Sequence, residues 1–520
     1  MKKTKIILFL AFTIAVIAFG IYSLKSERYK DTIRPAVKKV VMSVYNAFRD
    51  SDVTPESIHI KIKEKHFKKI KKIRDQALDD GYFIRDKDKY FPAKISLNDT
   101  IYDVKLRLKG DLTDHFDTDK WSYRIKVLDG KKILNMTTFS IQHPYTRNFI
   151  WEWVFHQAMK REGIIALDYK FINVSINNSD YGIFAMEEHF NDHMLAKNGR
   201  EPAPILKFDE ELNNQEYVKN KKLGIKNASN IDHYISSNIE IYGTGKTLDD
   251  SVKLGLQAKG LELLENFRTR KLKTSEVFNV QKLAKLFAIA DLLSANHSLS
   301  WVNQRYYFDS KTNYLEPVAY DAGVYFPDTK NSGILHFNKG LQDSTKLYDE
   351  LITNMSSDTI FYNQYLKELQ RVSNGEYVQT ILNGISNDIK RNLSILNTEF
   401  PRVRFDENLL YQRQKQIRSI LSPTNCVIAY LDKNNELKLG NVQMLPVKVL
   451  EIIQNDSLLV KINRIIPGIL TNKPIHYTYL KPQWNSFQDV HRKKLAVKYC
   501  IIGMGDIKYE KVKFIDSSFN

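Results

Sequence analysis

Cysteine is scarce in this sequence, which has only Cys426 and Cys500 among 520 residues. No CxxC pair and no Cys/His cluster occurs, so nothing in the sequence suggests a zinc site. Both cysteines fall in the last quarter of the chain, where a disulfide and two free thiols are equally compatible with the sequence. Hydrophobic residues make up 43% of the chain, which is ample for a sizeable core in at least one domain.

A complete phosphate-binding P-loop is also missing. The segment YGTGKT at 242–247 contains the lysine and two glycines, but Glu240 stands where the pattern requires its first glycine. No strong apolar strand precedes the segment, so we interpret it as a loop. No internal repeat or low-complexity segment is evident.

Acidic residues are outnumbered, with 60 Asp and Glu against 78 Lys and Arg, which gives a formal charge of +18. Such an excess raises the possibility of nucleic acid, anionic lipid or acidic substrates as partners. The charge is spread along the chain instead of being gathered in one basic segment, so we expect no nucleic-acid partner.

The N-terminus carries the one long uncharged run, IILFLAFTIAVIAFGIYSL at 6–24. As a helix it would span about 28 Å, close to the thickness of the hydrocarbon core of a bilayer. No clear small-x-small cleavage site follows it. We therefore expect residues 1–24 to form a single-pass membrane anchor with the bulk of the chain extracytoplasmic, although a lipidated or cleaved export signal is the alternative. Lysines and arginines flank both sides of the run, so the positive-inside rule does not fix its orientation.

The remainder of the chain divides into three parts. Residues 25–57 have helical apolar spacing and predict a juxtamembrane helix or linker. Residues 58–405 predict an α+β domain, with a strand at 58–62, a lysine-rich helix after it, three alternating strands within 90–127, a helix at 147–163 and a hairpin at 169–189. The lysine-rich run is read as a solvated helix face, with anionic lipid or polymer binding as the alternative. Residues 422–520 predict a small all-β, sandwich-like domain.

Two motifs of the α+β domain carry charge next to turns. In LRLKGDLTDHFDTDKWSYRIKV at 106–127, Gly110 permits a sharp turn or a close approach to a ligand. Arg124 and Lys126 share one strand face and can hold phosphates, unless that face is simply solvated. In YGIFAMEEH at 181–189, Glu187 and Glu188 point to opposite faces if the strand continues, so only one can face a cleft.

A third motif, HSLSWVNQRYYFDSKTNYLEPVAYDAG at 297–323, predicts a hairpin with SKTN as its turn. Asn303 and Asp321 flank that hairpin, which can bring them together. Amide and carboxylate oxygens are ligands that Mg²⁺ or Mn²⁺ accepts. The alternative is a hairpin with a purely structural aspartate.

Taken in order, KGDLTDHF, KWSYRIKV, the helix from Arg147, YGIFAMEEH and the segment ending in DAG resemble the CotH family, the spore-coat-protein-H type of atypical protein kinase. The resemblance covers roughly 58–400. It implies a much altered protein-kinase fold that transfers the γ-phosphoryl of ATP, with Mg²⁺ or Mn²⁺, to protein hydroxyls.

The resemblance also implies roles for single residues. Asp321 and Asn303 would hold the metal, and Gly110 would lie in the loop over the phosphates. Lys126, with Arg124 beside it, would be the phosphate-binding cation. Glu188 would orient that lysine or contact the nucleotide.

One position departs from the family pattern, which has an aspartate five residues before the asparagine. Ser298 stands there and cannot act as a carboxylate base, whereas the adjacent His297 titrates near neutral pH. The resemblance includes a branch with a histidine at this place, so we predict that His297 takes the role of the base or orients the acceptor.

The fold class we expect is α+β: an atypical protein-kinase-like, two-lobed domain with an N-terminal transmembrane helix and a C-terminal all-β, sandwich-like domain. The predicted activity is ATP-dependent phosphorylation of Ser or Thr in an envelope or cell-surface protein. One alternative is a non-catalytic surface or coat assembly protein, and the other is a different nucleotide-dependent transfer at the same metal site.

Overall fold

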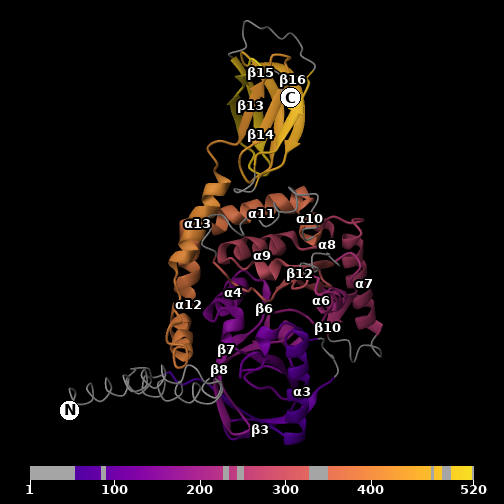
Figure 1. Cartoon of the computed structure of the whole chain (residues 1–520), viewed down its shortest axis with the longest axis vertical. Helices are drawn as coiled ribbons and strands as arrows, with labels where there is room; N and C mark the ends of the chain where they lie inside the picture. The colour runs from indigo at the N-terminus through magenta and orange to yellow at the C-terminus, as the bar shows by residue number, and fades with distance from the viewer. Residues whose placement is uncertain are drawn as a thin grey trace, which may run out of the picture.

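The structure, a computed structural model, describes residues 53–83, 89–225, 234–242, 251–326, 350–469, 474–482 and 494–517. The molecule is elongated (Figure 1), with a barrel of strands at one end, a body of helices around a sheet in the middle, and two further sheets at the other end. The chain begins with the barrel strands, enters the body once before it returns to add the last two strands of the barrel, and then passes through the body to the C-terminal sheets.

The barrel is closed and has seven strands in the order β1-β2-β3-β4-β5-β8-β7. A parallel pairing of β1 with β7, for example Ile58 with Val174, closes it, and the other neighbours are antiparallel. Alternate residues such as Ile60, Ile125 and Phe184 are buried in its interior, as the period of two requires. The strands are β1 (Ser57–Ile62), β2 (Phe91–Leu97), β3 (Thr100–Leu108), β4 (Tyr123–Val127), β5 (Thr138–Gln142), β7 (Tyr169–Ile176) and β8 (Ser179–Glu188).

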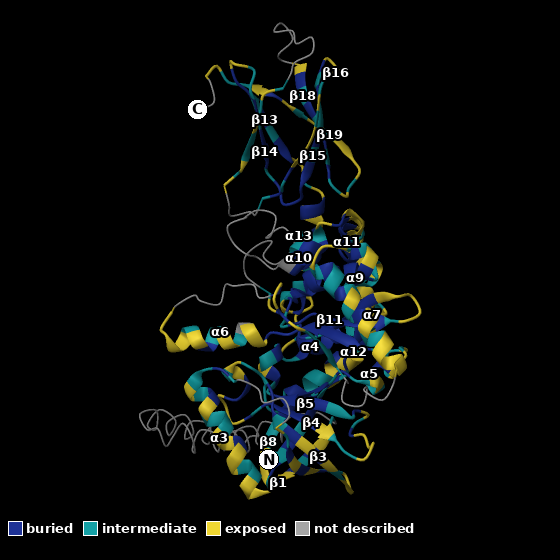
Figure 2. Ribbon diagram, turned by 90° about the vertical axis from the view of Figure 1, so that its right-hand side faces the viewer, coloured by how far each residue is buried: buried dark blue, intermediate teal, exposed yellow. Residues whose placement is uncertain are grey.

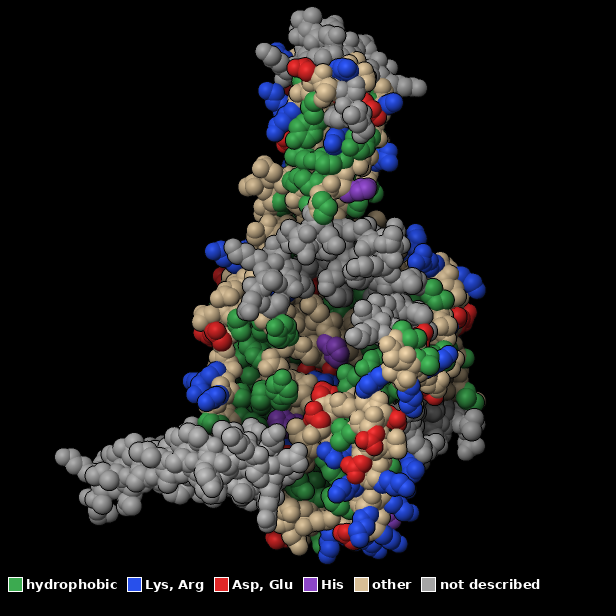
Figure 3. Space-filling model, viewed as in Figure 1, with side chains coloured by type: hydrophobic (Ala, Val, Ile, Leu, Met, Phe, Trp, Pro, Cys, Tyr) green, Lys and Arg blue, Asp and Glu red, His purple; other side chains and the backbone are tan. Residues whose placement is uncertain are grey.

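Helix α3 (Glu64–Asp80) lies on the barrel and buries only its apolar stripe. Phe67 stacks on Trp121 with ring centroids 5.6 Å apart, while Lys65, Lys68 and their neighbours face outward. The helix ends at Gly81, which has a φ of 70° and so adopts the left-handed conformation that favours glycine at a helix end. Figure 3 shows blue basic side chains gathered at this barrel end of the molecule.

The body is built around a five-stranded sheet of order β10-β9-β11-β12-β6. Helix α9 (Val280–Leu293) is buried along most of its length and packs against the sheet and against neighbouring helices α4 (Ile150–Arg161) and α11 (Thr359–Val372). The strands are β6 (Ile165–Ala166), β9 (Ile205–Phe208), β10 (Ile239–Tyr242), β11 (Arg305–Asp309) and β12 (Tyr314–Ala319). The remaining helices are α5 (Asp192–Lys197), α6 (Glu211–Lys222), α7 (Ser251–Arg268), α8 (Thr274–Val277), α10 (Glu350–Ser356), α12 (Gly375–Leu396), α13 (Asn408–Leu421) and the 3₁₀ turns η2 (Thr113–His115), η3 (Pro144–Arg147) and η5 (Asn296–Leu299).

The C-terminal part consists of two four-stranded sheets that face each other across buried side chains (Figure 2). Their orders are β17-β14-β13-β20 and β16-β15-β18-β19. Cys426 and Cys500 are both free, so no disulfide joins the sheets. The strands are β13 (Val427–Leu431), β14 (Leu437–Asn441), β15 (Val447–Gln454), β16 (Ser457–Ile466), β17 (Tyr477–Leu480), β18 (Leu495–Ile501), β19 (Ile507–Lys511) and β20 (Lys513–Phe514).

The fold class expected from the sequence, a kinase-like two-lobed domain with a transmembrane helix, is wrong as stated. The chain is α+β, but its strands form a closed seven-stranded barrel and three separate sheets. The alternating pattern at 90–127 predicts local antiparallel neighbours, and it carries no sign of the long-range parallel pairing that closes the barrel. Among the described residues, no helix has the length and apolar character needed to cross a membrane. The anchor expected at 1–24 and most of the linker expected at 25–57 lie outside the described residues.

Candidate functional site

A large polar cleft of about 1410 Å³ lies between the barrel and the body. Strands β3 and β4 line one wall, and strands β9, β10 and β11 with η5 line the other. Six of the seven residues proposed from the sequence line it, namely Gly110, Arg124, Lys126, His297, Asn303 and Asp321. The sequence motifs, which are far apart along the chain, therefore meet at one site.

The barrel wall of the cleft is strongly basic. In the register of β3 with β4, Arg107 lies opposite Arg124 and Lys105 lies opposite Lys126. Like charges directly opposite each other destabilise a sheet. A wall of this kind is suited to an anionic ligand, which would relieve that repulsion.

Lys109, directly after β3, is the buried cation of this wall. Its Nζ donates to Glu187 Oε2 and to Gln142 Oε1, both at 2.7 Å. Burial lowers the pKa of Lys109 although Glu187 opposes that effect. Burial alone would raise the pKa of Glu187, yet Lys109, Arg147 and Arg124 hold it below its ordinary value. Lys109 and Glu187 therefore form a buried ion pair beside the basic wall.

Arg124 differs from Lys109 because two of its guanidinium nitrogens have no hydrogen-bond partner among the described residues. Its side chain is buried, with 6% exposed, and its Nε and Nη1 atoms have no hydrogen-bond partner. A buried donor left unpaired costs about 1–3 kcal/mol, and more when it is charged. The arrangement is therefore that of a prepared anion contact in a cleft wall.

The pKa of His189 is affected by the positive charges of the same wall. It lines the cleft just after β8, and its ring meets that of Tyr242 at 90° with centroids 5.5 Å apart. Burial lowers the pKa of His189 well below its ordinary value, and the cations Arg124, Arg107 and Lys109 lower it further. The histidine is therefore neutral near pH 7 and can accept a hydrogen bond.

Asp321 is the anionic centre of the opposite wall. Its carboxylate is held by Arg147, with 2.7 Å from Nε to Oδ1 and 2.9 Å from Nη2 to Oδ2. Burial opposes ionisation, but Arg147 and His297 hold the pKa of Asp321 far below its ordinary value, and Lys109 across the cleft contributes. Asp321 is therefore fully ionised in the folded protein.

His297 and Asn303 complete this centre. His297 Nδ1 lies 3.1 Å from Asp321 Oδ1, and Asn303 Nδ2 donates to the His297 carbonyl at 2.9 Å. Asp321 raises the pKa of His297 in spite of burial. The His297 side chain is half exposed, at 52%, and faces the cleft. Ser298 is turned away, because its Oγ donates to the Ala295 carbonyl at 2.7 Å.

The backbone after Asp321 is held by a buried carboxylate from α4. Asp321 itself has a φ of 53°, a left-handed conformation that is uncommon for a residue other than glycine. Glu152 accepts from Ala322 N at 3.0 Å and from Gly323 N at 3.3 Å, and Asn148 Nδ2 donates to the Val324 carbonyl at 2.8 Å. These three bonds fix the direction in which the Asp321 carboxylate points.

Two of the proposed residues, Lys126 and Glu188, do not have the contacts that their expected roles require. Lys126 is exposed at the cleft rim with its Nζ 4.5 Å from the ring centroid of Tyr90. Glu188 is not in the cleft lining and pairs with Lys197 at 2.6 Å, so the expected contact between Glu188 and Lys126 is not formed. The reason is the alternation along β8, which points Glu187 toward Lys109 and Glu188 toward Lys197 on the opposite face of the strand.

Gly110 lies in the cleft lining with a φ of 104°. A Cβ atom at this position would lie 2.2 Å from the ring of His115. Glycine is thus required both by the backbone conformation and by the space.

Four residues of the site were missed by the sequence reasoning: Lys109, Glu187, Arg147 and Glu152. Lys109 and Glu187 are the sequence neighbours of Gly110 and Glu188, which were proposed. Which member of each pair contributes to the site depends on where strands β3 and β8 end, and the sequence does not define these ends. Glu152 had a visible signal, since it is a single carboxylate inside the otherwise apolar run FIWEWVF. Arg147 had none, because its partner Asp321 is 174 positions away.

The donor set of the site fits a hard divalent cation only in part. No group of three or more His, Cys, Asp or Glu side chains able to hold a metal occurs among the residues that the structure describes. Asp321 and Asn303 nevertheless provide a carboxylate and an amide oxygen, and Mg²⁺ is commonly bound by one or two carboxylates together with substrate phosphates. Each carboxylate oxygen has two lone pairs, so the contacts to Arg147 do not exhaust Asp321 as a ligand.

Comparison with known protein families finds no family model that matches this chain, and comparison with curated proteins finds no matching relative. The class of site is consequently defined by geometry alone. It is a cleft with a basic wall on a β-barrel and an Asp-Asn-His centre facing it.

Proposed function

We propose that the cleft binds ATP with Mg²⁺ or Mn²⁺ and that the protein transfers the γ-phosphoryl group to a hydroxyl group of a protein. The observation that carries this proposal is the unpartnered, buried Arg124 on a wall of like charges, facing an ionised aspartate and an asparagine in one cleft. A polyphosphate would neutralise the basic wall that carries Arg124. A divalent cation would then bridge the phosphates to Asp321 and Asn303 on the opposite wall.

The basic wall has the chemistry to neutralise a triphosphate. The Nε and Nη1 nitrogens of Arg124 have no hydrogen-bond partner among the described residues, and guanidinium groups form charge-assisted, often paired hydrogen bonds with phosphate. Lys109 adds a fixed positive charge held by Glu187. Since phosphoryl transfer asks mainly for positioning and for neutralisation of charge, these groups provide what the reaction requires.

Asp321 and Asn303 are the residues that would hold the metal. A bound Mg²⁺ or Mn²⁺ supplies neutralisation of the phosphate charge and a fixed orientation of the phosphates. Glu152 and Asn148 hold the backbone beside Asp321. They keep the carboxylate aimed into the cleft.

His297 is the group that orients the acceptor hydroxyl in this proposal. It is half exposed in the cleft, whereas the side chain of Ser298 is bonded to the backbone. The resemblance of the motifs to the CotH family agrees with this assignment and with a membrane-anchored, extracytoplasmic protein that modifies Ser or Thr of envelope or surface proteins.

The test is binding of labelled ATP by the purified full-length chain, measured with and without Mn²⁺. The variant Asp321→Asn keeps the shape of the side chain and removes its charge, so we expect ATP binding that no longer responds to Mn²⁺. Thermal unfolding of the variant shows that the fold is retained. ATP binding by the wild type that is absent, or that responds equally to Mn²⁺ in the variant, contradicts the proposal.

Two observations favour the non-catalytic alternative. Arg147 already neutralises both oxygens of Asp321, and the position of the usual catalytic aspartate is Ser298. A surface or coat assembly protein that binds nucleotide without turnover fits these two facts. Incubation with ATP and candidate acceptors separates the alternatives, because the mass of the product distinguishes a transferred phosphate, a transferred nucleotide and no transfer.

A further inference from the structure

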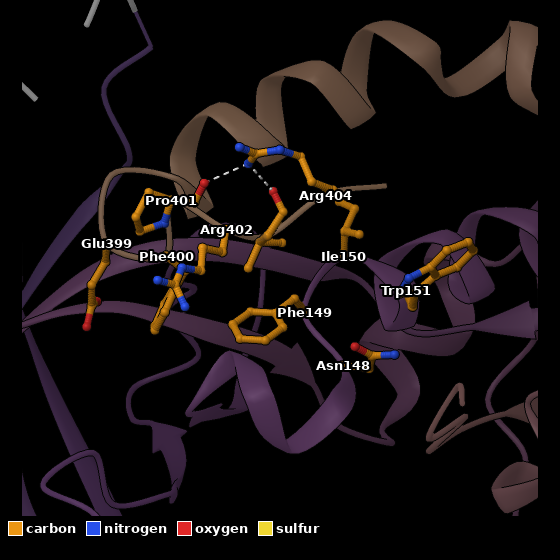
Figure 4. Close-up of a pocket in the computed structure, with 10 residues that line it drawn as sticks. Asn148, Phe149, Ile150, Trp151, Glu399, Phe400, Pro401, Arg402 and Arg404 are labelled. Atoms are coloured by element: carbon orange, nitrogen blue, oxygen red, sulfur yellow. Dashed lines mark hydrogen bonds between the residues drawn. The ribbon is translucent and has the colours of Figure 1, made fainter. Parts of the chain in front are cut away.

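A second hollow of about 620 Å³ lies outside the polar cleft, where η3 and the start of α4 meet the connection between α12 and α13. Its lining is mainly apolar. The rings of Phe149 and Phe400 meet edge to face with centroids 5.2 Å apart (Figure 4), and the buried side chains of Ile150 and Trp151 lie beneath the lining. The hollow is large enough for one aromatic or large aliphatic side chain with its backbone.

The rim of this hollow is positive. Arg402 and Arg404 are both exposed and line the hollow from the α12–α13 connection. Arg404 Nη1 donates to the carbonyl groups of Pro401 and Val403, as Figure 4 shows. Arg402 makes no ion pair or hydrogen bond within the described part of the chain. The one carboxylate in the lining, Glu399, is already bound to Lys120 at 2.7 Å.

Phe149 is held in a strained conformation at the floor of the hollow. It has a φ of 54° and a ψ of −114°, a region that residues other than glycine seldom occupy. Backbone strain of this kind is found where the surrounding structure holds a residue in place for a ligand. The Phe149 ring is half-buried and lies beside Phe400.

Two adjacent residues, Arg147 and Asn148, connect the hollow to the segment that contains Asp321. Asn148, which lines the hollow, donates to the Val324 carbonyl at 2.8 Å. The preceding residue, Arg147, forms the paired contact with Asp321. A peptide seated in the hollow therefore lies next to the segment that carries Asp321.

We propose that this hollow docks the acceptor protein through an acidic segment that bears an aromatic or large aliphatic side chain. The apolar side chain fills the space over Phe149 and Phe400, and flanking carboxylates pair with Arg402 and Arg404. The proposal rests on the proposed function in one respect only, since it names the substrate class for that reaction.

The test is direct peptide binding to the purified full-length chain without nucleotide or metal, followed by fluorescence anisotropy. The probes are the labelled peptide EEFEESE, its variant EEAEESE and the basic peptide KKFKKSK. We expect EEFEESE to bind, and each of the other two to bind at least about tenfold more weakly, because one loses the apolar anchor and the other the charge match.

Variants of the protein locate the binding site. The double variant Arg402→Glu and Arg404→Glu is expected to weaken EEFEESE at least about tenfold, and Phe400→Ala to weaken it similarly. Arg464→Glu is the matched control, because Arg464 is an exposed arginine on β16, in the C-terminal sheets. It should bind EEFEESE like the wild type.

Equal binding of EEFEESE by the wild type and the double arginine variant overturns the proposal, as does absence of binding to the wild type. A dimer in sedimentation analysis that the same double variant dissociates also overturns it, because a second copy is then the occupant. Failure of the proposed function is a separate result. It appears in ATP binding by Asp321→Asn, whereas the arginine variants should bind ATP normally.

Discussion

Replacing Arg124 by methionine should raise the free energy of unfolding of the ligand-free protein and lower the affinity of the cleft for an anionic ligand. Methionine keeps most of the apolar stem and removes a buried charge whose Nε and Nη1 are unpaired. An unsatisfied buried group of this kind costs about 1–3 kcal/mol, and the repulsion from Arg107 across the strands adds to it. Glu187 offsets part of the cost, since Arg124 helps to lower the pKa of Glu187. We therefore expect a gain of about 1–2 kcal/mol.

The assay is thermal unfolding with and without tripolyphosphate, a probe that tests the anion site without a nucleoside. A ligand at one hundred times its Kd stabilises the native state by about 2.7 kcal/mol, and 1 kcal/mol moves the midpoint by roughly 2–4 °C for a domain of 150–250 residues. The wild type should show this rise and Arg124→Met should not. Lys105→Met is the matched control, because Lys105 is exposed, opposite Lys126, and outside the cleft lining.

A loss of more than about 1 kcal/mol in ligand-free Arg124→Met would refute the reasoning, because it would mean that Arg124 has a stabilising partner. An equal rise with tripolyphosphate in wild type and variant would show that Arg124 does not contact the anion.

Three further predictions concern groups around the cleft. Lys109→Met leaves Glu187 buried without its lysine and should lower the free energy of unfolding, measured by urea denaturation, by about 3 kcal/mol. A second change, Glu187→Met, should recover most of this loss. A double variant whose loss is the simple sum of the two single losses contradicts the pairing. Glu152→Gln replaces one acceptor oxygen by an amide and should cost about 1–3 kcal/mol and weaken Mn²⁺ binding measured by electron paramagnetic resonance, whereas unchanged Mn²⁺ affinity would mean that Glu152 does not position Asp321. The pKa of His189 is lowered well below its ordinary value of 6.5, so its contribution to stability is present above pH 6.5 and is lost as the pH falls below it, because the unfolded chain then takes up a proton that the folded chain excludes. His189→Asn should therefore lose less stability than the wild type between pH 7 and pH 5 in thermal unfolding, and an identical loss contradicts the assignment.

Local patterns in the sequence predicted the elements whose partners are near in the chain. The strand at 58–62, the lysine-rich helix after it, the hairpin of β7 and β8 and the hairpin of β11 and β12 are all confirmed. Each has a clear period of two or of 3.6, or a turn such as NNSD or SKTN between two strands. The residue spacing that defines these elements is complete within one short window.

The closure of the barrel and the contact between Arg147 and Asp321 depend on segments that are far apart in the sequence. A pattern read over a short stretch of sequence therefore cannot reveal them. Ile58 pairs with Val174 in parallel, and Arg147 reaches Asp321 from 174 positions away. The choice between Glu187 and Glu188 depends on which face of β8 meets the body. The alternation of side chains along a strand shows that only one of the two glutamates can face the body, but it does not show which one.

The central claim is that Arg124 and Asp321 act on opposite sides of one ATP–metal complex. Isothermal titration of ATP into the full-length chain, at fixed Mn²⁺ and without it, tests this claim most directly for the wild type, Arg124→Met and Asp321→Asn. We predict weak ATP binding by Arg124→Met under both conditions, and binding by Asp321→Asn that no longer responds to Mn²⁺. ATP affinity that is the same in all three proteins, with and without Mn²⁺, would contradict the account.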